Sequence, residues 1–207
     1  MPTQRFFHLK EEKKNIIKQA AMEECARVPY ADISINKIIK AADISRGSFY
    51  TYFEDKDDLI QYLLQDFCDA CKRYILDQIE KADGDVVEAA ERMTLDMIRH
   101  GKDQPNSQIY RNLLLNVGTV TNMKTFGFGG FLHQNEEYLK FVEECYKRHN
   151  PEKCKVRDEQ QMGCVMELLI SLALKYTAIY HMAAVKPKEV EEIVHEQLKI
   201  IRRGLCE

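Results

Sequence analysis

The side chains best suited to bind a polynucleotide are concentrated in residues 46–52. Arg46 can bridge two acceptors on a guanine edge, and the methyl group of Thr51 can meet a thymine methyl. Gly47, between them, lets the backbone approach a duplex closely. Other donors fit phosphate contacts, which set the register without reading the bases. These predicted phosphate contacts are Ser34, Ser48, Tyr50, Tyr52 and Lys56. Asn36 and Lys37 lie near the start of the preceding helix. Both are predicted to contact the DNA backbone, and Asn36 could contact a base instead.

Closely spaced helix starts must position these groups. Ser34 is placed to cap a first helix, and Asp43 to end it, because a short Asx side chain tolerates the left-handed conformation. Ser45 then caps a second helix, and we include Ser45 among the predicted DNA-binding residues. Asp55 and Asp58 begin a third. The pattern predicts a helix-turn-helix unit whose second helix reads a major groove. A generic helical hairpin with a solvated polar face is the alternative.

The apolar side of the second helix is supplied by Phe49 and Phe53. With these residues in place, the segment resembles the TetR (tetracycline-repressor-like) family of bacterial transcription regulators, over residues 10–64. The positions that align with the family pattern are Ser34, Ile38, Ile39, Ala42, Asp43, Ile44, Ser45, Gly47, Ser48, Tyr50, Tyr52, Phe53, Lys56 and Leu59. The departures from the pattern are Glu24, Pro29, Ile39 and Asp43. The resemblance implies a homodimer on a double-stranded DNA operator.

Composition and charge agree with a DNA-binding domain followed by a larger body. Residues 1–56 hold 10 Lys and Arg against 8 Asp and Glu, whereas residues 57–207 hold 20 against 25. The basic excess is small, so phosphate affinity per subunit should be modest and salt-sensitive. No run approaches the ~20 uninterrupted apolar residues of a membrane span. The first residues lack an apolar signal segment, so we expect a cytoplasmic protein without membrane contact.

Everything after residue 56 reads as helix, so the predicted fold class is all-α. The N-terminal three-helix domain (1–56) is followed by a larger ligand-binding and dimerisation domain (57–207). A long amphipathic helix is predicted over 57–81. The further predicted helices are 86–100, 106–117, 134–148, 158–184 and 188–203, with boundaries at Gly84, Pro105, Pro151 and Pro187.

The last two predicted helices have the composition of a subunit interface. The first is apolar over most of its circumference, and the second carries one apolar stripe. Two such hairpins across a two-fold axis would form a four-helix bundle. The predicted interface residues are Met162, Val165, Leu169, Leu172, Ile193, Leu198 and Ile201. Burial within one subunit is the alternative.

A regulator of this kind needs an apolar cavity with a few placed polar groups. Candidate lining residues are Met97, His100, Tyr110, Phe128, Phe131, Tyr138, Met166, Tyr176 and Tyr180. The segment 126–131, rich in Phe and Gly, suggests an aromatic loop beside this cavity or a plain helix connection. No cluster of Arg or Lys marks an anionic ligand, so a mostly apolar or aromatic small-molecule effector is expected.

Cysteines leave a second possibility open. Cys68 and Cys71 stand three apart on the long helix, a spacing that permits a thiol or metal switch. No catalytic or phosphate-binding motif is present, so neither an enzyme nor a cofactor or metal is predicted. The leading interpretation is a transcriptional repressor released from a palindromic operator by its effector. The alternatives are a thiol or metal sensor on the same scaffold and a helical interaction protein that binds no DNA.

Overall fold

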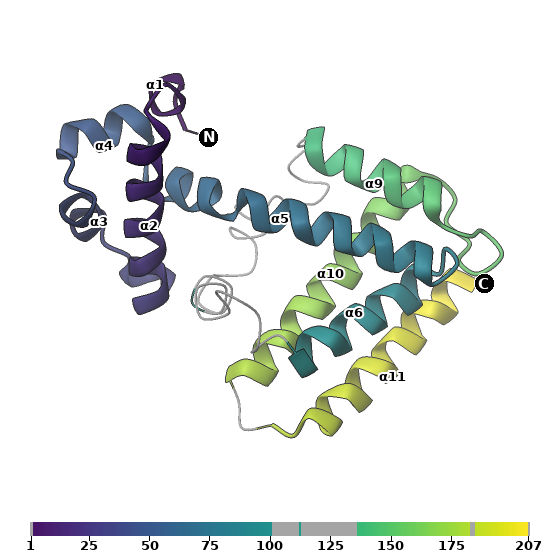
Figure 1. The fold of residues 1–207 in the computed structure, drawn as a ribbon. Coiled ribbons are helices and arrows are strands. Elements are labelled where there is room, and N and C mark those ends of the chain that lie inside the picture. The colour runs from purple at the N-terminus through teal and green to yellow at the C-terminus, as the bar shows by residue number, and fades with distance from the viewer. Residues whose placement is uncertain (1, 101–111, 113–135, 183–184, 207) are drawn as a thin grey trace. The chain divides into compact units, whose positions relative to one another are not determined.

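The computed structural model describes residues 2–100, 112, 136–182 and 185–206, and all regular elements in these ranges are helices (Figure 1). They are α1 (Gln4–Phe7), α2 (Glu11–Arg27), the 3₁₀ turn η1 (Tyr30–Asp32), α3 (Ile35–Ala41), α4 (Arg46–Tyr52), α5 (Lys56–Lys81), α6 (Val86–His100), α9 (Glu136–Arg148), α10 (Glu159–Met182) and α11 (Pro187–Cys206). The all-α prediction is confirmed. The predicted helix 106–117 lies outside the described residues except for Asn112.

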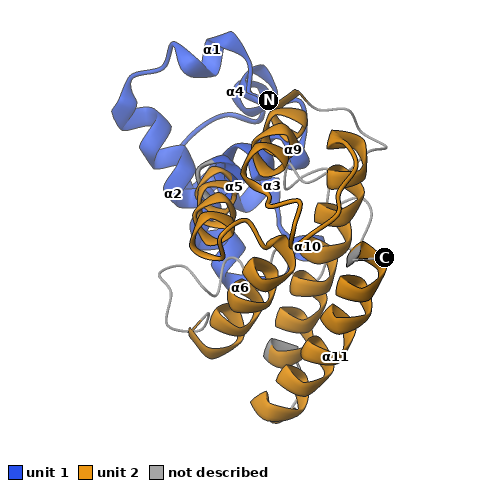
Figure 2. Cartoon of the chain, turned by 90° about the vertical axis from the view of Figure 1, so that its right-hand side faces the viewer, with its two compact units in different colours: residues 1–68, 108–126 blue, residues 69–107, 127–207 orange. Residues whose placement is uncertain are grey.

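The chain forms two compact units, which Figure 2 colours separately. Unit 1 comprises residues 1–68 and 108–126, and unit 2 comprises residues 69–107 and 127–207. Helix α5 continues through the division between Cys68 and Asp69. The predicted domain boundary at residue 56, where α5 begins, stays a prediction.

The core of unit 1 is built from the apolar sides of its short helices. Helix α2 packs on α3, and α1 packs on α4. The side chains of Ile17, Ile38, Phe49, Phe53 and Leu59 have no exposed surface. Burying large apolar side chains is the main stabilising contribution for helices of seven residues, which are too short to be stable alone.

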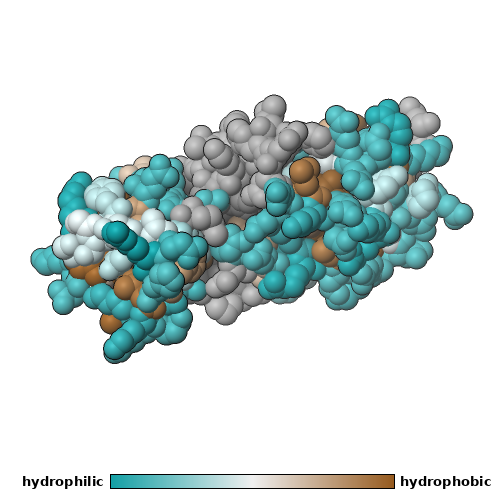
Figure 3. All heavy atoms as spheres, turned by 90° about the horizontal axis from the view of Figure 1, so that it is seen from above, coloured by the Kyte–Doolittle hydropathy of each residue, from teal (hydrophilic) through white to brown (hydrophobic). Residues whose placement is uncertain are grey.

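Unit 2 is a group of helices packed around α6 and α10. Helix α6 packs on α10 and α11, and α10 also packs on α9. The stretch Glu159–Tyr180 is long and apolar enough for a membrane span by length and composition alone, with 56% of its apolar window buried within the chain. Its contacts with α6, α9 and α11 explain that composition as a core helix. Figure 3 shows hydrophilic side chains over most of the visible described surface.

The predicted subunit interface is largely occupied by this core. The buried members of the predicted set are Met162, Val165, Leu169, Leu172 and Leu198. For these five, the structure shows burial within one subunit, which was the alternative. Ile201 is half-buried and Ile193 is 48% exposed. A helix that is apolar on several sides is predicted to be buried, but its periodicity does not indicate which neighbouring element covers each side.

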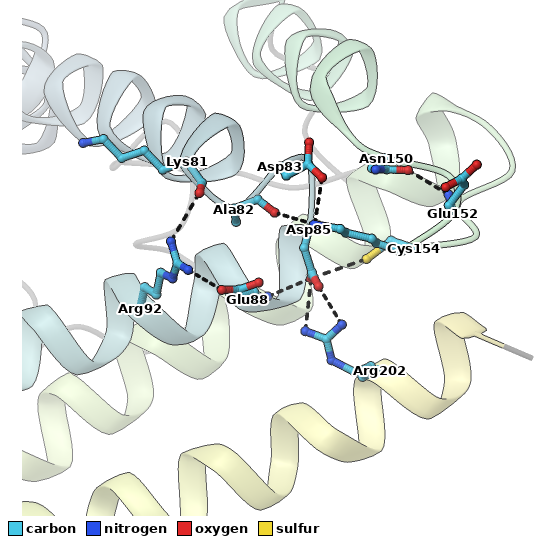
Figure 4. Close-up of polar contacts among 11 residues, drawn as sticks. Lys81, Ala82, Asp83, Asp85, Glu88, Arg92, Asn150, Glu152, Cys154 and Arg202 are labelled. Atoms are coloured by element: carbon cyan, nitrogen blue, oxygen red, sulfur yellow. Dashed lines mark hydrogen bonds and ion pairs between the residues drawn. The ribbon is translucent and has the colours of Figure 1, made fainter.

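The turn between α5 and α6 depends on a glycine. Gly84 has a φ of +76°, and a Cβ atom there would lie 2.5 Å from the backbone nitrogen of Asn150 and 2.8 Å from the carbonyl oxygen of Arg148. The Asn150 N–H donates to the Gly84 carbonyl oxygen at 3.0 Å. Asp85 then caps α6 by accepting the N–H groups of Val87 (3.1 Å) and Glu88 (2.9 Å), in the region drawn in Figure 4. The turn thus joins α6 to the chain that follows α9.

Candidate nucleic-acid interface

Helix α4 begins with the predicted serine cap. The Ser48 N–H donates to the Ser45 hydroxyl oxygen at 3.0 Å, and the two hydroxyl oxygens lie 2.9 Å apart. Asp43, with a φ of 48°, takes the left-handed conformation predicted for the end of α3. The Lys13 ammonium donates to the carbonyl oxygens of Ala42 and Asp43 at 3.0 Å each. The turn between the two helices is therefore fixed at both ends.

The predicted cap of α3 is wrong in its mechanism. Ser34 occupies the N-cap position, but its side chain makes no capping hydrogen bond. Its N–H instead donates to the Glu24 carboxylate at 3.2 Å. Burial acts to raise the pKa of Glu24, but the hydrogen bonds from Arg27 and Ser34 outweigh it and hold that pKa below its usual value. The departure from the family pattern at Glu24 is thus a structural link from α2 to the start of α3.

The start of α5 follows the prediction. The Asp58 N–H donates to the Asp55 carboxylate at 2.8 Å, and the Asp58 carboxylate accepts the Glu54 N–H at 3.1 Å. Both carboxylates therefore satisfy backbone donors near the helix start, as a capping box does. This arrangement fixes where α4 ends and the long helix begins.

The exposed surface of α3 and α4 brings three predicted DNA-contacting residues together. The Arg46 guanidinium donates to Asn36 Oδ1 at 2.8 Å and to the Tyr50 hydroxyl at 3.4 Å. Its carbon Cζ also lies 5.5 Å from the centroid of the Tyr50 ring. Asn36, Arg46 and Tyr50 are all exposed, so this cluster offers donors and an aromatic edge to solvent. We call it the Arg46 cluster.

The other predicted contacts differ in how available they are. Lys37 and Gly47 are exposed. The Thr51 hydroxyl donates to the Gly47 carbonyl oxygen at 2.8 Å, so its methyl group is what remains for a base. Tyr52 is half-buried, with its ring 6.1 Å from that of Phe6. Ser34 and Ser48 are half-buried, and Ser45, whose hydroxyl caps α4, is exposed.

Lys56 is held inside the unit. Its ammonium donates to the Tyr30 carbonyl oxygen at 3.1 Å and lies 4.4 Å from the centroid of the Tyr30 ring. The Tyr30 hydroxyl in turn hydrogen-bonds to Asp57. Sequence reasoning missed this link from η1 to α5, because Tyr30 and Lys56 are 26 residues apart. A phosphate contact by Lys56 would have to replace or share these bonds.

The predicted pocket residues do not meet in one described cavity. Tyr110, Phe128 and Phe131 lie outside the described residues. His100 is exposed and pairs with Asp96 at 3.0 Å. The members inside or near the core are Tyr138 and Tyr176, which are buried, and Met97 and Tyr180, which are half-buried.

Only Met166 of the predicted set lines the hollow found in the described part of unit 2. This hollow has about 270 Å³ of empty space, part of it open to solvent. Its lining residues come from α5, α6 and α10: Ile75, Gln78, Ile79, Val86, Ala89, Ala90, Met93, Met166, Leu169 and Ile170. Nine of these ten are apolar, so the hollow suits an apolar group. Sequence patterns gave no signal that separates these residues from the rest of the core.

Burial disfavours the thiolate form of four of the cysteines. Burial raises the pKa of Cys25 and Cys145 to about 12 and that of Cys71 to about 11. Burial raises the pKa of Cys154 as well. The thiolate is the form that is oxidised or binds metal, so these four groups are poor sensors. Within the described ranges, no group of three or more His, Cys, Asp or Glu side chains is placed to hold a metal ion.

Helices α3 and α4 are joined at a fixed turn and carry the Arg46 cluster on their exposed face, which defines unit 1 as a helix-turn-helix DNA-binding unit. Residues 17–63 match the model of the bacterial regulatory proteins of the tetR family. Residues 17–63 therefore form a DNA-binding domain of the TetR family of transcriptional regulators.

Solved structures show the same fold over nearly the whole chain. NalD from Pseudomonas aeruginosa, described as the secondary repressor of the MexAB-OprM multidrug efflux pump, has a TM-score of 0.54 and 18% identity, covering 95% of this chain and 98% of that one. A TetR-family regulator from Streptomyces coelicolor has a TM-score of 0.52 and 20% identity, covering 93% and 97%. At these identities the likeness establishes the fold alone.

Proposed function

We propose that the protein is a repressor that binds a palindromic operator as a homodimer, one helix-turn-helix unit per half-site, and is released by a small-molecule effector. The observation that carries the proposal is the Arg46 cluster. It places a guanidinium, an amide and a phenol together on an exposed face of α3 and α4, where they could meet base edges and phosphates of a major groove. Its place of action would be the cytoplasm, and it would need no metal, cofactor or catalytic group.

Exposed apolar side chains in unit 2 support a dimer. Leu168 on α10 is 59% exposed, and Ile193 and Ile200 on α11 are 48% and 68% exposed. Ile193 and Ile200 are seven residues apart and therefore share one helix face. A second copy of α10 and α11 would cover these side chains in a four-helix bundle. The dimer surface proposed here differs from the predicted one, whose other members are mostly core residues.

A hydrogen bond within unit 1 supports coupling of effector binding to DNA binding. The Asn112 amide donates to the carbonyl oxygens of Cys25 (2.9 Å) and Ala26 (2.8 Å), in the last turn of α2. A residue far along the chain thus caps a helix of the DNA-binding unit. An effector that prefers a conformation without this bond would weaken operator binding by, at most, the difference between its affinities for the two conformations.

An apolar or aromatic effector fits the apolar lining of the hollow between α5, α6 and α10. Only a small part of that hollow is enclosed, far less than the roughly 300–1,000 Å³ typical of drug-sized ligand sites, so an effector would have to enlarge it. The alternative of a thiol sensor is weakened by the raised pKa values of Cys25, Cys71, Cys145 and Cys154. The alternative of a helical protein that binds no DNA would leave the Arg46 cluster without a role.

The test is fluorescence anisotropy with labelled duplex from the region upstream of the protein's own gene. Random duplex serves as competitor, at two salt concentrations. Tight binding that resists the competitor is the expected result, and its loss with rising salt reports the phosphate contacts. If that duplex binds no better than random DNA, selection from a genomic library follows. A dimeric, folded protein that selects no sequence there would exclude a sequence-specific repressor.

A further inference from the structure

The N-terminal segment is docked on the end of the recognition helix α4. The Thr3 N–H donates to the Tyr52 carbonyl oxygen at 2.9 Å, and the Thr3 hydroxyl donates to the Thr51 carbonyl oxygen at 2.7 Å. Both bonds join residues about 48 positions apart. One residue thus supplies two donors to adjacent carbonyl groups on α4.

These carbonyl groups need partners from outside the helix. The last four carbonyl groups of an α-helix receive no hydrogen bond from an N–H group within the helix. In α4 the Phe49 carbonyl oxygen receives the Phe53 N–H at 2.9 Å as the chain leaves the helix. The carbonyl groups of Thr51 and Tyr52 are bound by Thr3 instead. Since α4 has seven residues, its last turn is more than half of it.

An aromatic anchor holds Thr3 in place. Phe6, in the four-residue helix α1, has no exposed surface. Its ring centroid lies 4.8 Å from that of Phe53 and 5.0 Å from that of Tyr62. A four-residue helix is not stable by itself, so this packing keeps the segment folded.

We propose that Thr3 is a positioning residue for DNA recognition, which holds the last turn of α4 and with it the side chains of Tyr50 and Thr51. This proposal rests on the proposed function, because it concerns how α4 presents its side chains to DNA. Without Thr3, the last turn frays, and Tyr50 and Thr51 lose their fixed direction while the Ser45 cap still holds the first turn.

Two substitutions at Thr3 remove first one and then both of its hydrogen-bond donors to α4. Thr3→Val removes the hydroxyl donor and keeps the shape and the N–H. Thr3→Pro removes both donors and places a ring carbon against the Tyr52 carbonyl oxygen, although the Thr3 φ of −71° suits proline. Gln4→Ala, at an exposed neighbour, is the matched control. Circular dichroism and thermal unfolding establish that each variant is folded.

The DNA measurement compares duplexes that the wild-type protein selects from a random-sequence library with unselected duplexes. We expect Thr3→Val to weaken binding to selected duplexes by roughly two- to tenfold, the effect of one hydrogen bond, and Thr3→Pro to weaken it further. Binding to unselected duplexes should weaken less, because it depends on phosphate contacts, to which Tyr50 contributes and the base-contacting Thr51 does not. An unchanged ratio of the two affinities in both folded variants would overturn the proposal.

Hydrogen exchange gives a readout without DNA. Amides of residues 50–53 should exchange faster in both Thr3 variants than in Gln4→Ala, while amides of α2 and α3 keep their rates. Uniform acceleration across unit 1 would mean that Thr3 supports only global stability, and unchanged rates would mean that it holds nothing. A wild-type protein that selects no duplex would overturn the proposed function, and exchange would still decide whether Thr3 holds α4.

Discussion

The guanidinium of Arg202 binds both carboxylate oxygens of Asp85, with Nη1 2.7 Å from Oδ2 and Nη2 3.1 Å from Oδ1 (Figure 4). The two residues are 117 positions apart. The same carboxylate caps α6, and the Cys154 thiol lies 3.7 Å from its Oδ1. One buried carboxylate therefore joins the start of α6, the end of α11 and the chain between α9 and α10.

Replacing Arg202 should destabilise unit 2. Arg202→Met leaves the buried Asp85 carboxylate without its cation, a change that costs about 3–5 kcal/mol in a fully buried pair. Because the Arg202 side chain keeps 37% of its surface in water, we expect a smaller loss, of about 2–3 kcal/mol, in the free energy of unfolding. Chemical denaturation measures it. Arg203→Met, at the exposed next position, should change stability by about 0.5 kcal/mol or less. Equal effects of the two substitutions would contradict the role of the pair.

The same pair makes stability depend on acid. Burial acts to raise the pKa of Asp85, but the hydrogen bonds from Arg202 and from the N–H groups of Glu88 and Val87 hold it below its usual value. The pair's contribution is therefore complete above the unfolded pKa of about 3.9 and is lost as the pH falls from there through the lower folded-state pKa. The free energies of unfolding of the wild type and of Asp85→Asn, plotted against pH, should converge as the pH falls through that range. A constant difference between the two plots would show that the pair does not make stability depend on acid.

Gly47→Ala should separate folding from DNA binding. A Cβ atom at Gly47 meets only the Ser45 hydroxyl oxygen, at 3.7 Å, and alanine favours a helix by about 1 kcal/mol. We expect unchanged or higher thermal stability and weaker binding to every duplex, because the methyl group keeps the backbone from the phosphates. Anisotropy and thermal unfolding on the same sample test this. Full DNA affinity would show that no close approach occurs at Gly47.

Arg46→Ala should relax sequence preference. The loss of a bidentate contact to a base costs about 1–3 kcal/mol of discrimination. Asn36→Ala, which removes the 2.8 Å partner of Arg46, should alter the same base position by less. Binding-site selection with each variant compares them. Tyr50→Ala should weaken binding to all duplexes, and identical selected sequences for all three variants would show that the Arg46 cluster does not read bases.

Ile200→Lys should dissociate the proposed dimer. Its side chain is 68% exposed in the single chain, and a lysine at the centre of an apolar interface would be buried without a partner. Light scattering during gel filtration should show a shift from dimer to monomer at micromolar concentration. Lys188→Glu, at another exposed position of α11, should leave the dimer intact. A dimer that survives Ile200→Lys would place the interface elsewhere.

Local chemistry made much of the helix-turn-helix unit predictable. The Ser45 cap, the left-handed Asp43 and the Asp55 start involve residues within a few positions of one another. The capping partner of α3 was missed because Glu24 lies 10 residues before Ser34. Local sequence patterns do not predict hydrogen bonds between residues of separate helices.

The body was predictable in its helices and less so in its contacts. Apolar periodicity located α6, α10 and α11 within a few residues. It could not separate Leu169, which lies in the core, from Leu168, which lies on the surface. The Asp85–Arg202 pair and the lining of the hollow depend on which helices become neighbours, which no short window contains.

Gly84 sets a practical rule for engineering this protein. Any side chain at that position would collide with the backbone of Asn150 and Arg148, whereas Gly204 has open space around it. A library that randomises the helices of unit 2 and the turns between them, to obtain a sensor for a new compound, should therefore keep codon 84 constant. Codon 204 can be varied to any residue except proline, which would break α11. The fraction of folded clones with codon 84 randomised, compared with the fraction with codon 204 randomised, would measure the difference.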